Sequence, residues 1–421
     1  MTSTLDAPEQ HSGSRWLNGV ALTIGLGALV LGPVAGGLLS YLSLRGRQTA
    51  DAVSVTTVGV SMAVLGLGIG GALVWAGYQG LRRRLSPPFR PGMIWFWGCL
   101  VGLGLSLPIG QLILLFDLLA PVTFPLFHVL AVALPAILIL VLVGHGVKHN
   151  TPAPSRRQML GQVALGAFGV TVIAFTIEVM VAMMGLFIVG VGMALSPGGL
   201  AQLAELQALL ANPAGLQDPQ VLARWLLKPG ILFSVTVMLV IVVPLIEELV
   251  KSIGVPLIYL GMRRVPSPAQ AWLWGIAVGT GFAVTEGLFN GAANLPFWVG
   301  IALLRIGATA MHLVTAGLTG LGWMRLLASR RFLSLLGAYL TSVVLHSAWN
   351  GLTVLMAVSS LWIMAQPGDA TRLVGGGLGI LIGLTGLMLL TGIIIGTAAY
   401  VTRRVRATVR LERSGEAHVD E

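Results

Sequence analysis

The sequence is poor in charge. Only 10% of its 421 residues are Asp, Glu, Lys or Arg, whereas soluble proteins carry about 25%. A chain with so few ionic side chains cannot cover a globular domain with a water-exposed surface. Apolar residues make up 56% of the chain and the mean hydropathy is +0.89. This composition indicates a polytopic membrane protein.

Cysteine and acidic residues are also scarce. The single cysteine, Cys99, supports neither a disulfide framework nor a CxxC zinc site. Basic residues outnumber acidic residues by 25 to 15, which gives a net charge of +10. No basic run is interleaved with stacking aromatic residues, so no nucleic-acid partner is expected.

Long apolar runs predict an all-α membrane bundle of about ten transmembrane helices. The expected spans are 17–44, 53–79, 93–116, 122–147, 160–195, 231–261, 269–292, 297–324, 332–362 and 373–401. Each reaches the roughly 20 residues that cross a bilayer, and the first is too long for a cleaved signal peptide. Basic residues gather in alternate loops, such as Arg82 to Arg84, and after the last span, which predicts both termini in the cytoplasm.

These spans divide the chain into four expected regions of a multi-pass protein of the cell membrane. Residues 1–195 form a five-helix membrane region of unknown role. Residues 196–229 form an extracytoplasmic amphipathic segment. Residues 230–362 form a core of four transmembrane helices that carries the polar motifs, and residues 363–421 form the final span and a basic cytoplasmic tail.

Ionisable residues inside the spans cluster in the C-terminal half. A charge at the bilayer centre costs about 2.5–3.5 kcal/mol, so such residues mark functional sites. Four successive spans carry them: Glu247, Glu248 and Lys251 in the sixth, Glu286 in the seventh, Arg305 and His312 in the eighth, and His346 and Asn350 in the ninth. This half of the chain is therefore expected to carry the chemistry.

The residue types point to hydrolysis. Buried carboxylates and imidazoles can activate a water molecule, and they can also hold a divalent metal such as zinc. Lys251 lies four residues after Glu247 and three after Glu248, so it can pair with either carboxylate. Arg305 alone is expected to be a charge partner that keeps helices in register. The HExxH, GxGD and GxSG signatures of other hydrolases are absent.

Four short motifs resemble a known family. EELVK at 247–251 resembles the EExxK motif of the PrsW-type intramembrane proteases, which are related to the CAAX prenyl endopeptidases and bacteriocin-processing proteins. FAVTE at 282–286 resembles their FxxxE motif. His312 and the HSAWN at 346–350 resemble their later histidine motifs. The motifs stand in the family's order on four successive spans.

The resemblance implies an intramembrane endopeptidase of glutamic or metallo type. It implies a membrane-anchored protein substrate in a lipid environment, anti-sigma factors being the known type. The catalytic residues that it implies are Glu247, Glu248, Glu286, His312, His346 and Asn350, supported by Lys251, Phe282 and Arg305.

The resemblance also implies individual roles. Glu247 or Glu248 would be the general base, and Lys251 would set the charge of the pair. Glu286 and His312 would orient or ligate the water or metal, and the histidine and asparagine of HSAWN would stabilise the oxyanion. If a metal is used, the implied ligands are Glu247, Glu286, His312 and His346.

Two other functions use the same residues. A proton- or cation-coupled transporter or channel could employ these carboxylates, but transporters often consist of two similar halves. Here the polar residues are confined to one half, which favours the enzyme. An inactive scaffold that binds membrane partners is the third reading.

Overall fold

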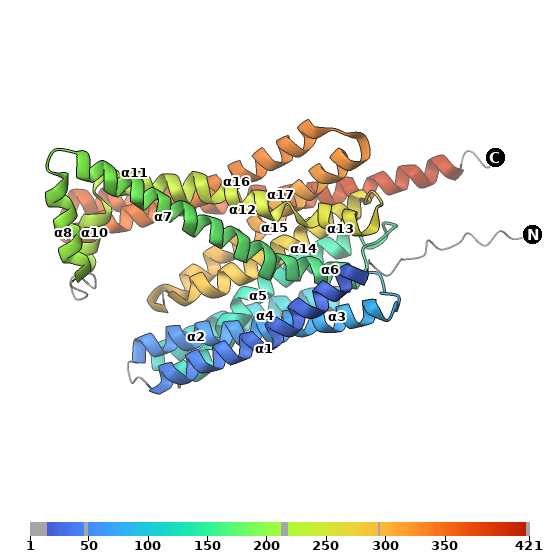
Figure 1. Cartoon of the computed structure of the whole chain (residues 1–421), viewed down its shortest axis with the longest axis horizontal. Helices are drawn as coiled ribbons and strands as arrows, with labels where there is room; N and C mark the ends of the chain where they lie inside the picture. Colours follow the sequence, from blue (N-terminus) through green and yellow to red (C-terminus); the bar gives the residue numbers. More distant parts are fainter. Residues whose placement is uncertain (1–14, 46–48, 212–217, 294, 418–421) are drawn as a thin grey trace, which may run out of the picture. The chain divides into compact units, whose positions relative to one another are not determined.

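The computed structural model describes residues 15–45, 49–211, 218–293 and 295–417 (Figure 1). Helices account for 89% of the chain, and no strand occurs in these ranges, which confirms the all-α prediction. The α-helices are α1 (Arg15–Arg45), α2 (Thr49–Leu65), α3 (Gly71–Leu81), α4 (Met93–Phe116), α5 (Ala120–Gly146), α6 (Arg156–Ala164), α7 (Thr171–Leu195), α8 (Gly199–Ala211), α10 (Pro219–Leu226), α11 (Pro229–Val237), α12 (Val243–Lys251), α13 (Gly254–Met262), α14 (Pro268–Asn290), α15 (Trp298–Ser329), α16 (Phe332–Ala365) and α17 (Ala370–Ala417).

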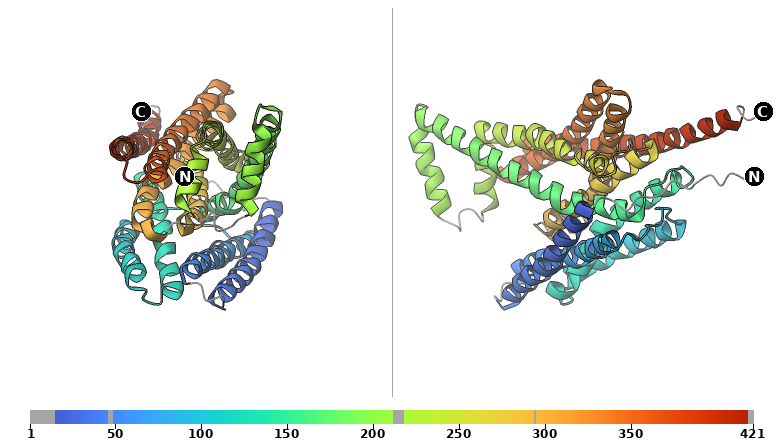
Figure 2. Two further views of the ribbon diagram at one scale, coloured as in Figure 1. Left: turned by 90° about the vertical axis from the view of Figure 1, so that its left-hand side faces the viewer. Right: turned by 45° about the vertical axis from the view of Figure 1, so that its right-hand side comes forward.

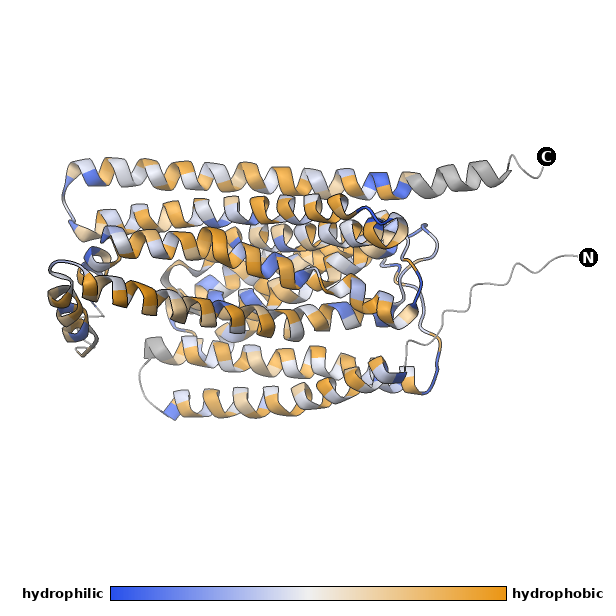
Figure 3. Ribbon diagram, turned by 45° about the horizontal axis from the view of Figure 1, so that its top comes forward, coloured by the Kyte–Doolittle hydropathy of each residue, from blue (hydrophilic) through white to orange (hydrophobic). Residues whose placement is uncertain are grey.

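Nine helical stretches within the described ranges are long and apolar enough to cross a membrane. Figure 3 shows apolar residues along most of the length of the long helices. The remaining expected span, 269–292, coincides with α14, which is helical but is not among the nine. Most α14 residues are buried within the protein, so the helix does not need a strongly apolar composition. The cytoplasmic placement of both termini stays a prediction.

Three expected spans are interrupted by π-helical segments. These are η1 (Gly66–Gly70), η2 (Leu165–Val170) and η3 (Met238–Val242). The sixth span is the most broken, because η3 separates α11 from α12 and a turn separates α12 from α13. A π-turn inserts an extra residue into a helix and often marks a functional site. In this span it directly precedes the helix that carries EELVK.

The chain divides into two compact units. The first comprises Met1–Thr171, Lys251–Ser342 and Ile394–Glu421, and the second comprises Val172–Val250 and Val343–Ile393. Each is described by itself. The four expected regions remain predictions.

Helices of the first unit approach one another closely through glycine. In α14, a Cβ atom at Gly275 or Gly279 would meet backbone atoms of α15, including the carbonyl oxygens of Ala316 and His312. These two glycines, four residues apart on α14, therefore lie against α15, and the backbone of His312 belongs to the contact. Among the N-terminal helices, Gly36 of α1 likewise approaches the carbonyl of Gly59 in α2, and Figure 2 shows these two helices side by side.

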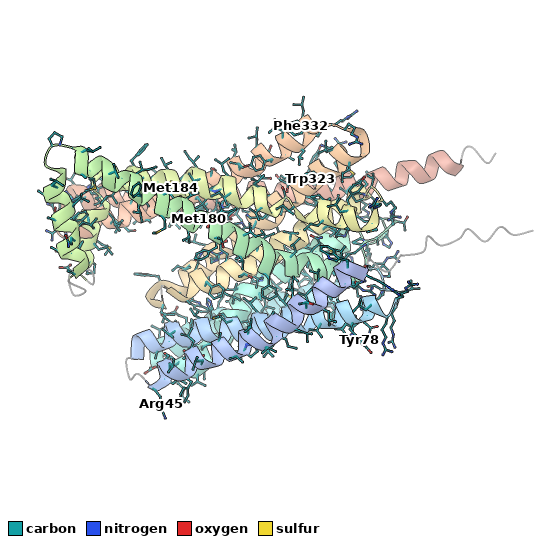
Figure 4. The ribbon with its side chains drawn as sticks, viewed as in Figure 1. Arg45, Tyr78, Met180, Met184, Trp323 and Phe332 are labelled. Carbon is teal, nitrogen blue, oxygen red and sulfur yellow. The ribbon has the colours of Figure 1, made fainter. Side chains whose placement is uncertain are left out.

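The second unit contains the expected amphipathic segment. Its described part is helical, with α8 and α10, whereas residues 212–217 lie outside the described ranges. Asp218 caps α10 by accepting a hydrogen bond from the amide of Gln220. Lys228 pairs with Glu205 of α8 at 3.0 Å and so joins α8 to the residue that precedes α11. On the long helix α7 of this unit, methionine side chains such as Met180 are exposed, as expected for a surface facing lipid (Figure 4).

Candidate active site

One polar group lies in the first unit and centres on Glu286. Its Oε2 atom is 2.8 Å from Nε2 of His312 and 3.2 Å from Nη2 of Arg305. Asn290, one turn later on α14, donates its amide hydrogen to Oε1 of the same carboxylate. Arg305 is thus a charge partner of Glu286, and the two join α14 to α15.

His312 is held on both ring nitrogens. Nζ of Lys251 lies 2.7 Å from Nδ1 of His312 and 4.3 Å from the centre of the Phe282 ring. Because an ammonium group has only donors, Nδ1 accepts, and Nε2 must carry the hydrogen that reaches Glu286. These two contacts fix the orientation of the imidazole ring. Lys251 is only 1% exposed, so this contact is made away from water.

The second unit holds the other predicted group. Oε1 of Glu248 lies 2.9 Å from Nδ1 of His346, and Oε2 of Glu247 lies 3.8 Å from Nε2 of the same ring. All three side chains are buried, and Glu248 has no exposed surface. Glu248 therefore orients the ring, and Glu247 faces its other nitrogen.

The face between Glu247 and His346 suits a cation or a polarised water. In a neutral ring whose Nδ1 donates to Glu248, Nε2 presents a lone pair toward the Glu247 carboxylate. A separation of 3.8 Å exceeds hydrogen-bond length. Two acceptors that face each other are stabilised by a shared positive charge or a shared donor. A metal ion supplies the positive charge, and a water molecule supplies the hydrogen-bond donor.

Both histidines follow the same pattern. His312 has Glu286 on one nitrogen and His346 has Glu248 on one nitrogen. Metal-ligating histidines in proteins almost always have their second nitrogen held by a carboxylate, a carbonyl or water. The donor chemistry of the two rings therefore fits a metal, although Lys251 contacts the His312 nitrogen that a metal would take.

Asn350 lies one turn beyond His346 and supplies a hydrogen bond that the backbone of the sixth span lacks. Its Nδ2 atom donates to the carbonyl oxygen of Leu239 at 2.8 Å. In the π-segment, the amide of Val243 bonds to the carbonyl of Met238. With the same five-residue spacing, the Leu239 carbonyl would accept from the amide of Pro244. Proline has no amide hydrogen, so this carbonyl has no backbone donor. Asn350 supplies it, and thereby fixes the start of α12.

Asn350→Ala is therefore expected to lower the stability of the folded protein by about 1–3 kcal/mol, because the Leu239 carbonyl loses its donor. Adding Pro244→Ala restores a backbone N–H, so the double variant should recover much of the loss. Thermal unfolding in detergent measures both effects. Thr353→Ala, which removes a bond only within α16, serves as the control. A double variant less stable than Asn350→Ala would contradict this account.

A third histidine, which the sequence did not single out as a site residue, is buried beside α14. His128 of α5 has no exposed surface, accepts a hydrogen bond from the Trp298 indole at 3.0 Å and donates to the carbonyl of Leu288 at 3.0 Å. Leu288 lies two residues after Glu286, so His128 holds the end of α14 that carries this carboxylate. The only sequence signal was a polar residue within an apolar run.

Comparison with known proteins decides between the functions. The model of the PrsW family of intramembrane metalloproteases matches residues 154–367, about half of the chain. The chain belongs to the PrsW family. It is therefore an intramembrane protease, a peptide-bond hydrolase and a multi-pass integral membrane protein.

The PrsW match extends beyond the four motifs. It begins at residue 154 and thus includes α6, α7, α8 and α10, whereas the motifs suggested a resemblance over about 231–360. The N-terminal helices α1 to α5 lie outside the match. No curated protein and no solved structure matches the chain.

Proposed function

We propose that this PrsW-family chain hydrolyses a peptide bond of a membrane-anchored protein with Glu247 as the general base. The supporting observation is the Glu247–His346 pair, in which Oε2 of the carboxylate and Nε2 of the imidazole lie 3.8 Å apart. Water bound on this face would donate to Glu247 as it attacks the carbonyl. Glu247 would then pass the proton to the leaving amine.

We further propose that residues of both polar groups take part in catalysis. Chain continuity supports this, because α12 carries Glu247 and, one turn later, Lys251. On α16, Ser342 lies one turn before His346 and donates to the carbonyl of Thr315, one turn after His312. Helix α12 thus carries residues of both groups, and α16 joins His346 to the turn that follows His312.

Glu247, His312 and His346 are the proposed ligands of a divalent metal such as zinc, and Glu247 would use one carboxylate oxygen for the metal and the other to accept the water proton. Carboxylate and imidazole are suitable zinc ligands, and each of these side chains offers one such ligand atom. A bound metal would polarise the attacking water and stabilise the negative charge of the tetrahedral intermediate. Glu248 and Glu286 would hold the two imidazoles in their ligating orientation. An oxyanion contact from Asn350 stays a prediction.

The test is cleavage in a defined membrane. The purified full chain is reconstituted into liposomes with a transmembrane reporter, and ion flux is measured in the same vesicles. Cleavage without flux is expected. Flux without cleavage would instead identify a transporter, and neither would identify a scaffold. A reporter built on an anti-sigma transmembrane segment, compared with an unrelated segment, tests the proposed substrate type.

A further inference from the structure

A pocket in the second unit lies apart from the residues described above. It has a volume of about 390 Å³ and is lined by Arg224, Leu227, Trp362, Ala365, Gln366 and Arg372. This volume lies within the range of small-ligand sites. The lining combines two guanidinium groups, an amide and an indole, which together suit a polar, negatively charged group.

The two arginines give the pocket a positive charge. Arg372 has one ion pair with a described residue, a long one of 3.7 Å from Nε to Asp369. Asp369 also accepts hydrogen bonds from the first turn of α17. Arg224 has no ion pair or hydrogen bond within the described part of the chain. The neighbouring Lys228, by contrast, is matched by Glu205 at 3.0 Å.

The pocket lies where membrane-spanning helices begin and end. Trp362 and Ala365 belong to the last turns of α16, and Arg372 belongs to the first turn of α17. Leu227 lies two residues before the stretch that begins at Pro229. Arginine and tryptophan at span ends lie at the level of lipid headgroups.

Apolar side chains continue from this level along the same helices. Leu373 and Val374 of α17 are 61% and 63% exposed, and Phe233 of α11 is 70% exposed. Such surfaces suit acyl chains, whereas a small soluble anion would gain nothing from them. We propose that the pocket binds the phosphate of an anionic phospholipid, with Arg224 and Arg372 as the phosphate-contacting residues and the acyl chains along α17 and α11.

Lipid retention tests this proposal independently of proteolysis. The purified full chain is stripped of lipid and offered equal amounts of phosphatidylglycerol and phosphatidylcholine with identical acyl chains. Native mass spectrometry then measures which lipid stays bound. Preferential retention of phosphatidylglycerol is expected. Arg224→Gln and Arg372→Gln should each weaken it about fivefold, the effect of one basic residue near a membrane surface.

The control is Arg45→Gln, which removes an equally basic and exposed side chain at the end of α1 (Figure 4). It should leave retention unchanged, and Arg224→Lys, which keeps the charge, should retain part of the preference. Equal phosphatidylglycerol binding by the wild type and both glutamine variants would overturn the proposal. Displacement of the lipid by soluble glycerol phosphate would show a small-anion site instead. Arginine-dependent binding of an acidic peptide without lipid preference would show a peptide site.

Discussion

Replacing Glu247 by glutamine is expected to slow cleavage of a transmembrane reporter by about 10²–10⁴-fold, the usual contribution of a general base. Glutamine keeps the size of the side chain but cannot take a proton from water. The variant should fold, because Glu248 and not Glu247 makes the short contact to His346. Rates in liposomes at saturating reporter, with thermal unfolding as the folding check, measure both parts.

Glu248→Gln is the matched control on the adjacent residue. It weakens the group that orients His346 but leaves Glu247 in place. Loss of such an orienting carboxylate typically lowers metal affinity about 10–100-fold. Excess zinc should therefore restore cleavage by Glu248→Gln and fail to restore it by Glu247→Gln. If both variants fold and cleave at the normal rate, neither glutamate is catalytic.

Removal of divalent metal is expected to abolish reporter cleavage. The residues available to activate water are the carboxylates and imidazoles of α12, α14, α15 and α16, and a metal lowers the pKa of a bound water toward neutrality. Dialysis against a chelator followed by metal analysis should show loss of about one equivalent of metal per chain together with loss of activity. Added zinc should restore both.

The control for metal removal is His346→Ala, which takes away a proposed ligand while the chelating conditions stay the same. It should bind little metal before dialysis and should gain no activity from added zinc. Full activity of the wild type after complete metal removal would contradict the metal assignment. Water activation would then rest on the glutamates alone.

Candidate site residues could be chosen from the sequence, but their contacts could not. Because charges in apolar spans are rare, burial cost selected Glu247, Glu286, His312 and His346 together with Glu248, Lys251 and Arg305. The choice between the two adjacent glutamates could not be made, since helical spacing places both near Lys251. The contact that distinguishes them joins Glu248 to a ring 98 positions away in the chain, and no local pattern encodes such a pairing.

For the fold as well, local sequence predicted the helices but not the contacts between distant residues. Apolar runs predicted nine of the spans correctly, because lipid-facing helices must be apolar along most of their length. The π-segment η3 left no trace in the run Met238–Val242, whose residues suit either helical register. Only Pro244 and Asn350, read together with the structure, explain how its unpaired carbonyl is satisfied.

The enclosed position of α14 has a consequence for how the protein is made. Segments enter the membrane from the translocon according to their own hydrophobicity, and α14 falls short of the apolar character of the other spans. Two of its glycines, Gly275 and Gly279, lie against the backbone of α15, the next long helix in the chain. We therefore expect α14 to be retained in the bilayer as a hairpin with α15, so that the helix carrying Glu286 is committed to the membrane only when its partner has been synthesised.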